Sequence, residues 1–373
     1  MVDRTDAKAY HRRKNAVRLL GIVFGITYAL VWCWIAPAWM DRLAPALGNR
    51  WLALLCVASV VFLAQEVLLL PMSFYSGYVL EHRYDLSNET VRGWGIREVK
   101  ELAVGAVLGA ILLAGLYGLL WYGGRLWWLW LWFGWILLSV GLTQLFPVLI
   151  LPIFYKATPI EDESLVGRLH QLAEGTGLRL SGVFRLSLSE ETKKPNAMLA
   201  GLGPTRRVLL SDTLLDAFEP AEIETVFVHE LGHHVRGHIH KGIVLSALAA
   251  TVVIAGIVWR LGPYAGSDAT QWSTAVAVLP QVFLVVLAVG FLSRPVVNAI
   301  LRGFETQCDR DALTATGPEA YRSAFRKLGD MSLADPDPSK PIEVFFYDHP
   351  PISKRLALAG EAEADPSTSA SAP

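Results

Sequence analysis

Long apolar segments separated by short polar ones give this chain its most visible pattern. A helix that crosses the hydrocarbon core of a bilayer needs about 20 predominantly apolar residues. Segments of this length occur six times: residues 19–40, 51–71, 102–121, 127–150, 243–261 and 275–292. The fourth begins with a cluster of tryptophans, as is typical of a membrane–water interface. Six such runs favour spanning helices over the buried core helices of a soluble protein, so the pattern predicts a mainly α-helical, multi-span membrane protein.

Two features of these segments bear on their role. The first segment follows Arg12, Arg13 and Lys14 and is too long for the apolar region of a cleaved signal peptide, so we expect a retained anchor. Gln65 and Glu66 lie inside the second segment, where a carboxylate should face a polar cavity or a partner. Two interpretations stay open for this pair: the lining of a water-filled chamber, or a structural contact near a helix end.

The polar regions, residues 155–240 and those from 302 onward, predict a smaller mixed domain. Helical spacing covers residues 163–176, whereas residues 182–188 and 207–210 have the pattern of strands. The whole chain is therefore expected to combine a helical membrane domain with a soluble domain that contains a small β-sheet.

Composition supports the membrane assignment and excludes some functions. Hydrophobic residues make up 53% of the 373 residues and charged residues 18%, and the formal net charge is -1. This balance provides no overall positive field, so we expect no nucleic-acid partner. Cys33, Cys56 and Cys308 are far apart in the sequence, which indicates neither a disulfide framework nor a cysteine zinc cluster.

The most specific chemical signal is the HExxH motif formed by residues 229–233. Ser211-Asp212 can cap a short helix, and a second helix should begin at Glu219-Pro220, carry the motif and continue into the fifth span. His229 and His233 then share one helix face and can bind one Zn²⁺ ion, with Glu230 beside it as general base. The alternative is a polar helix face near the membrane.

Catalytic zinc needs a third protein ligand and an open position. Glu305 is the candidate, on a helix expected after the sixth span. Asp309 lies four residues later, on the same face, and can accept the outer N–H of a histidine ligand. The competing interpretation is a solvated charged face paired with Arg302 and Arg310.

Three further histidines follow the motif: His234, His238 and His240. On a continuous helix, His234 and His238 point about 100° away from the zinc face. They form a second metal site or, as we expect, a face exposed to water or lipid headgroups.

Together these motifs resemble the integral-membrane zinc metalloproteases of the type I CAAX prenyl protease group and their bacterial relatives. The resemblance covers most of residues 60–360 and rests on motifs that occur in the expected order: Asn196-Ala197, RVLLSDTLL at 207–215, HELGHH at 229–234, Arg302, Glu305 and Asp309 in RxxExxxD, and His349-Pro350-Pro351 with Arg355.

The resemblance implies a zincin-like catalytic domain with one Zn²⁺ per chain, bound by His229, His233 and Glu305, and Glu230 as base. It also implies that His349 and Arg355 support the site and that Asn196, beside an edge strand, holds the substrate backbone. We expect that edge to be residues 207–210. Lys194-Pro195 and Met198 depart from the eukaryotic pattern, as does the count of six spans rather than seven.

The expected domain organisation follows from these motifs. It comprises a four-span membrane domain at 1–152, the first part of the zinc protease domain at 153–240, two further spans at 241–293, the second part of the protease domain at 294–360 and a disordered tail at 361–373. The expected function is a membrane endopeptidase for peptide or protein substrates, lipid-modified in CAAX-type processing, or misfolded in quality control. A membrane scaffold with a structural metal is the non-enzymatic alternative.

Basic residues predict the orientation in the membrane, which we expect to be a bacterial inner membrane. The side that would contain the N-terminus and the zinc site carries Arg4, Lys8, Arg12, Arg13, Lys14, Arg18, Arg83, Arg92, Arg97 and Lys100. The loops on the other side carry only Arg42, Arg50, Arg125 and Arg260. Lys and Arg in short loops favour the cytoplasm, so the catalytic domain should face it.

Overall fold

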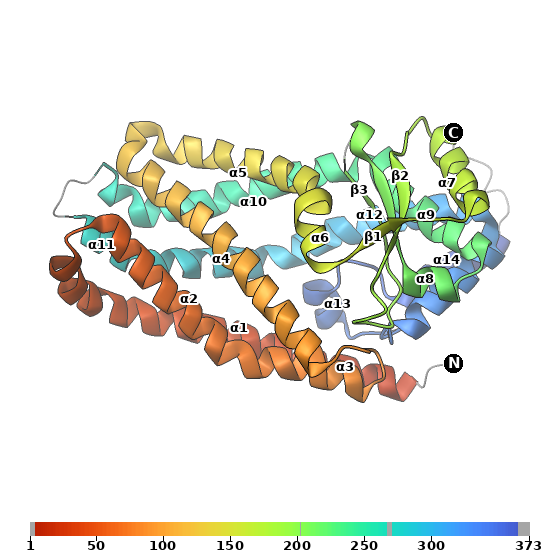
Figure 1. The fold of residues 1–373 in the computed structure, drawn as a ribbon, viewed down its shortest axis with the longest axis horizontal. Helices are drawn as coiled ribbons and strands as arrows, with labels where there is room; N and C mark the ends of the chain where they lie inside the picture. Colours follow the sequence, from red (N-terminus) through yellow and green to blue (C-terminus); the bar gives the residue numbers. More distant parts are fainter. Residues whose placement is uncertain (1–3, 202, 267–270, 365–373) are drawn as a thin grey trace.

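The computed structural model describes residues 4–201, 203–266 and 271–364. It is an elongated molecule with a helical bundle at one end and a small sheet surrounded by helices at the other (Figure 1). Among the described residues, six helices are long and apolar enough to cross a membrane, as the sequence predicts. They are built on α1 (Arg4–Leu47), α2 (Arg50–Phe74), α4 (Val91–Tyr122), α5 (Trp127–Leu145), α10 (His238–Leu261) and α12 (Leu279–Met331).

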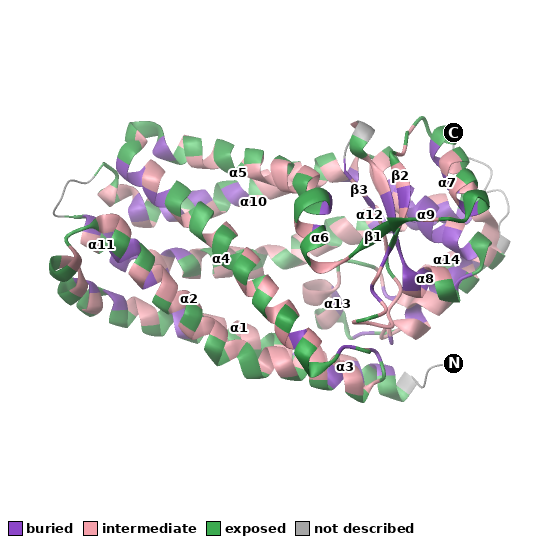
Figure 2. Ribbon diagram, in the orientation of Figure 1, coloured by how far each residue is buried: buried purple, intermediate pink, exposed green. Residues whose placement is uncertain are grey.

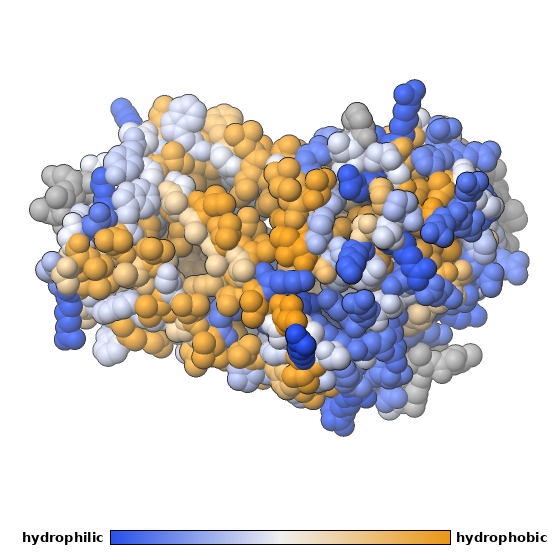
Figure 3. Space-filling view, in the orientation of Figure 1, coloured by the Kyte–Doolittle hydropathy of each residue, from blue (hydrophilic) through white to orange (hydrophobic). Residues whose placement is uncertain are grey.

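The bundle presents apolar side chains outward, while the sheet end of the molecule is mainly hydrophilic (Figure 3). Buried residues are sparse along the bundle and more frequent around the sheet (Figure 2). α1 has 44 residues, which corresponds to about 66 Å at 1.5 Å per residue. Because the hydrocarbon core of a bilayer is about 30 Å thick, α1 is long enough to continue beyond it to the sheet end.

Shorter elements connect these helices. They are the π-helical turns Tyr75–Val79 and Phe146–Ile150, the 3₁₀ turns Gly124–Leu126, Gly203–Thr205 and Gly262–Tyr264, and the helices α3 (Leu80–Arg83), α6 (Leu151–Phe154), α11 (Trp272–Ala277) and α13 (Lys340–Phe346). At the end of the bundle farthest from the sheet, Tyr117 is fully buried and its hydroxyl donates to the carbonyl of Ala275. This contact ties α4 to α11.

The sheet has four strands in the order β1-β2-β4-β3. Their bounds are β1 (Ala157–Pro159), β2 (Gly182–Leu186), β3 (Ala197–Ala200) and β4 (Arg207–Ser211). β2 and β4 run parallel, whereas β1 and β3 are the antiparallel edge strands. The expectation that residues 207–210 form the edge is wrong, because the short β3 pairs with β4 and covers it.

Helices pack against the sheet around one apolar core. α7 (Glu163–Gly175), α8 (Asp212–Ala217) and α9 (Pro220–Val235) contribute buried residues to it, among them Leu169, Leu214 and Phe227. The predicted helix starts are present: Ser211 caps α8, and the Glu219 side chain and Glu222 form a capping box at the start of α9.

Two helix boundaries differ from the sequence expectation. α9 ends at Val235 and does not continue into the fifth span, because Gly237 has a φ of 65° and α10 starts in a new direction. Glu305 does not lie on a separate helix after the sixth span, because α12 continues from the bundle through Glu305 and leaves helical backbone angles only later, at Gly317. The boundary expected between residues 293 and 294 therefore falls inside α12.

The C-terminal segment is more ordered than expected at its beginning. α14 (Ile352–Ala364) includes residues 361–364, the first residues of the segment that the sequence predicts to be a disordered tail. The remainder of that tail, residues 365–373, lies outside the described residues.

Candidate active site

The motif helix α9 packs against α12, and this contact joins the three expected metal ligands. The Nε2 atom of His229 lies 3.0 Å from Oε2 of Glu305. The Nε2 atom of His233 lies 3.2 Å from the other oxygen, Oε1, of the same carboxylate. His229 and Glu305 are buried, and His233 is partly exposed. One carboxylate therefore faces both imidazoles in an almost enclosed position.

The spacing of these donor atoms fits a zinc ion. Zinc binds histidine nitrogen and carboxylate oxygen at about 2.0–2.2 Å, so two such atoms in a tetrahedral arrangement lie about 3.3 Å apart. The separations of 3.0 and 3.2 Å are close to this value. Two histidines and one glutamate are also a donor set used by catalytic zinc, which keeps a fourth position open.

Asp309 and Arg355 orient His229 from the side of its Nδ1 atom, opposite the Nε2 that is expected to bind metal. Asp309 is fully buried, and its Oδ1 lies 2.9 Å from Nδ1 of His229. Arg355 donates from Nε to Oδ2 of Asp309 over 2.9 Å and from Nη2 to Oδ1 over 2.5 Å. Burial alone lowers the pKa of His229, but its hydrogen bonds to Asp309 and Glu305 outweigh burial and raise the pKa to about 9. Asp309 therefore fixes the ring with Nε2 towards Glu305.

Glu230 is next to His229 on α9 and is partly exposed. Burial of its carboxyl group raises the pKa of Glu230 above the usual value, although the neighbouring histidines oppose this effect. A general base works best when its pKa lies nearer the working pH, so the shift suits a group that accepts and returns a proton.

His349 reaches the same carboxylate from the segment between α13 and α14. Its Nε2 lies 3.3 Å from Oε2 of Glu305, and its Nδ1 lies 2.8 Å from Oδ1 of Asp348. Arg302 positions the segment by donating to the carbonyls of Glu343 and Tyr347. The sequence predicts His349 only through the family resemblance, and it does not predict Asp348. The one signal for Asp348 is its position directly before His349.

Asn196 precedes the edge strand β3 and has an exposed side chain. Its backbone is fixed, because its N–H donates to Oγ of Ser211 over 2.8 Å and its carbonyl accepts from the Ser211 N–H over 2.9 Å. His234 contacts the same strand: its Nε2 lies 2.7 Å from the carbonyl oxygen of Leu199. The motif helix and the edge strand are thus joined at Leu199, three residues after Asn196.

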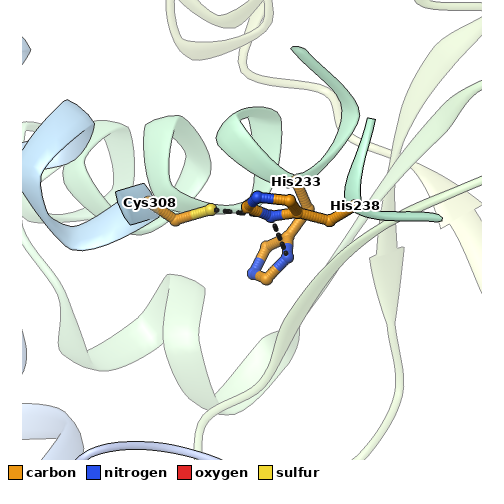
Figure 4. Close-up of side chains that lie close together, drawn as sticks. All are labelled: His233, His238 and Cys308. Atoms are coloured by element: carbon orange, nitrogen blue, oxygen red, sulfur yellow. Dashed lines mark hydrogen bonds between the residues drawn. The ribbon is translucent and has the colours of Figure 1, made fainter. Parts of the chain in front are cut away.

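His238 does not lie where the sequence placed it. Since the helix breaks at Gly237, His238 turns inward and is buried against His233 and Cys308 (Figure 4). The expectation of a face exposed to water or lipid is wrong for His238. His240 is exposed.

Comparisons with known proteins agree with this architecture. Residues 3–156 match a family model described as CAAX prenyl protease N-terminal, five membrane helices, and residues 159–363 match the model of peptidase family M48. The chain is 25% identical over 367 residues to the uncharacterized metalloprotease YhfN of Bacillus subtilis, covering 96% of this chain and 86% of that protein. It is 26% identical over 345 residues to the CAAX prenyl protease 1 homolog of Arabidopsis thaliana, covering 91% of this chain and 81% of that protein.

The fold is also similar to a solved structure. The crystal structure of S. mikatae Ste24p superposes with a TM-score of 0.79 at 21% identity, covering 95% of this chain and 87% of that chain. The expected resemblance to integral-membrane metalloproteases is therefore confirmed. Because the second family model covers more than half of the sequence, this chain belongs to peptidase family M48.

Proposed function

We propose that this chain is a zinc-dependent endopeptidase that cleaves peptide bonds in membrane-associated substrates. The observation that carries the proposal is the convergence of His229, His233 and Glu305, with donor separations that suit zinc, directly beside Glu230. When bound, zinc acts as a Lewis acid that activates a water molecule and polarises the carbonyl of the scissile bond. Three protein ligands leave a position open for this chemistry, whereas structural zinc is closed by four, which disfavours the scaffold alternative.

The other residues divide the remaining tasks. Glu230 accepts the proton of the attacking water and later gives it to the leaving amine. Asp309 holds His229 in the tautomer whose Nε2 can bind metal, and Arg355 holds Asp309. Burial alone lowers the pKa of His349, but the hydrogen bond from its Nδ1 to Asp348 raises it. The protonated ring can then donate from Nε2 towards the oxygen on which negative charge develops.

The substrate backbone is proposed to pair with the outer edge of β3. The carbonyl of Asn196 accepts a hydrogen bond from β4. Since successive residues of an antiparallel strand turn their backbone N–H and C=O groups to opposite sides, residues 197 and 199 direct theirs away from β4, to the free edge. An extended peptide can add there as a further strand. His234 already contacts the carbonyl of Leu199. The backbone of Ala197 and the side chain of Asn196 are therefore the groups that we propose to hydrogen-bond the peptide.

Two substrate classes remain, and one observation favours the first. Several relatives are named CAAX prenyl protease 1, which supports C-terminal processing of a lipid-modified peptide. A quality-control protease for misfolded membrane proteins is the second candidate, because it needs the same site without a lipid-binding requirement. The excess of Lys and Arg at the sheet end of the bundle supports a catalytic domain that faces the cytoplasm. The membrane that we propose is a bacterial inner membrane.

The test compares prenylated and unprenylated peptides of the same sequence, with Glu230→Gln as the matched inactive control. The variant should bind zinc and fold normally but cleave at least about 10²-fold more slowly, since it keeps the size of the side chain and loses the base. Near-normal cleavage by Glu230→Gln would contradict the mechanism. Equal cleavage of both peptides would favour quality control over CAAX-type processing.

A further inference from the structure

The imidazole of His233 has a different neighbour at each of its ring nitrogens. Its Nε2 lies 3.2 Å from Glu305, in the proposed catalytic zinc site. Its Nδ1 lies 3.3 Å from Nδ1 of His238, and that same atom of His238 lies 3.6 Å from Sγ of Cys308 (Figure 4). Donor atoms from α9, α10 and α12 therefore converge a second time, at the nitrogen of His233 that the first site does not use.

These separations match the edges of a metal tetrahedron. Zinc–nitrogen bonds of about 2.0–2.1 Å place two nitrogens about 3.3 Å apart, and a zinc–sulfur bond of about 2.3 Å places sulfur about 3.6 Å from nitrogen. The values in the structure are 3.3 Å and 3.6 Å. The two separations therefore fit donor atoms that bind one metal ion.

The surroundings orient His238 and leave room for the sulfur of Cys308. His238 lies with its Nε2 3.3 Å from Oε1 of Gln307, which accepts its N–H and leaves the lone pair of Nδ1 directed at the other two donors. The ring of Phe304 stacks on His238 at 4.2 Å and fixes its plane. Cys308 is fully buried. A Cβ at Gly232 would lie 3.1 Å from its sulfur, so the glycine provides the room that sulfur occupies.

We propose that His233 Nδ1, His238 Nδ1 and Cys308 Sγ form a second metal site. It binds a thiophilic divalent ion, such as Cd²⁺, or Zn²⁺ supplied beyond the one equivalent that fills the first site. Thiolate and imidazole are the ligands that such ions prefer. Binding releases the thiol proton of Cys308 and the Nδ1 proton of His233 to solvent. Because the second proton comes from a neutral imidazole, the second ion binds more weakly than the first.

The second ion has a consequence for the first site, and this consequence alone rests on the proposed function. His233 would serve both ions, so occupation of the second site alters a ligand of the catalytic zinc. We expect excess Zn²⁺ to inhibit peptide cleavage. Cys308→Ala should require at least about 10-fold more Zn²⁺ for the same inhibition, since loss even of a group that only orients a metal ligand weakens metal binding by about 10–100-fold.

The test measures metal binding without substrate. The full chain in detergent, first loaded with one equivalent of Zn²⁺, is dialysed against Cd²⁺, and its metal content and ultraviolet absorption are recorded. The wild type should bind one additional ion and develop a thiolate-to-cadmium charge-transfer band. Cys308→Ala and the nearly isosteric Cys308→Ser should keep the first ion and lose both the additional ion and the band.

Matched controls use the other two cysteines. Cys33→Ala and Cys56→Ala should retain the additional ion and the band. Glu230→Gln should retain both as well, so that failure of the peptidase proposal is distinguishable from failure of this one. The inference is overturned if the wild type binds a single ion, or if the band persists in Cys308→Ala. It is also overturned if His238→Gln weakens binding of the first ion and leaves binding of the additional ion unchanged. His238 would then act only as a hydrogen-bond acceptor for His233.

Discussion

Replacement of Arg355 by methionine tests how α14 supports the proposed zinc site. Arg355 makes two hydrogen bonds to the carboxylate of Asp309, and its guanidinium lies 4.0 Å from the ring centre of Phe325. Asp309 is fully buried and the Arg355 side chain is 11% exposed, so solvent cannot replace the lost charge. Methionine keeps an unbranched side chain over Phe325 and removes the cation together with its hydrogen bonds to Asp309.

The magnitude follows from this burial. Removal of one partner of a buried ion pair typically costs about 3–5 kcal/mol, because the remaining charge is uncompensated. Asp309 keeps one partner in His229, so we expect about 3 kcal/mol, the lower end of this range. Since Asp309 orients a metal ligand, zinc affinity should also fall by about 10–100-fold.

Unfolding is followed by thermal denaturation in one detergent at one protein concentration, and zinc affinity by competition with a chelator. Arg355→Lys retains the charge but cannot make both hydrogen bonds, so it should give intermediate values. The double variant Asp309→Asn/Arg355→Met removes both charges and should recover stability but not zinc affinity. Wild-type stability together with wild-type zinc affinity in Arg355→Met would refute the reasoning.

Three further predictions concern binding, stability and orientation. Asn196→Ala should impair cleavage and leave the melting temperature near wild type; a large loss of stability with intact specific activity would make Asn196 structural. Burial alone raises the pKa of Glu222, but hydrogen bonds from Lys327 and Ser323 lower it below 4.5. The destabilisation caused by Glu222→Gln should therefore be full above pH 4.5 and shrink as pH falls further, as melting curves across pH would show. Reporter fusions at the C-terminus should report the cytoplasm and those near Ala46 the outside, whereas an outside signal from the C-terminus would overturn the orientation.

Local periodicity accounts for what the sequence predicted well. Six spans could be predicted because length and apolarity determine them, without reference to any partner. The approach of His229 and His233 follows from helical spacing alone, and so does the shared face of Glu305 and Asp309. In contrast, β1 and β3 have only three and four residues, too few for a recognisable alternation. Because the sequence does not reveal β3, it predicts residues 207–210 as the edge of the sheet.

Tertiary contacts account for what periodicity could not supply. His349 is 44 residues from Glu305 in sequence, and no pattern in one chain places its Nε2 3.3 Å from that carboxylate. Arg355 has the sequence features of a helix surface charge until Asp309 is seen buried beside it. The family resemblance supplied both residues because motif order records contacts that local spacing does not.

The error at His238 arises from one residue and changes the chemistry of the site. On a continuous helix, His238 would point away from His233, and no second group of ligands would form. Gly237 adopts a φ of 65°, which favours glycine, and the chain starts α10 in a new direction. The side chain of His238 then enters the space between α9 and α12, where Cys308 is fully buried. A glycine shortly after the last histidine of a motif helix thus indicates where that helix ends. It matters for function because the end of the helix determines the direction in which the next histidine points.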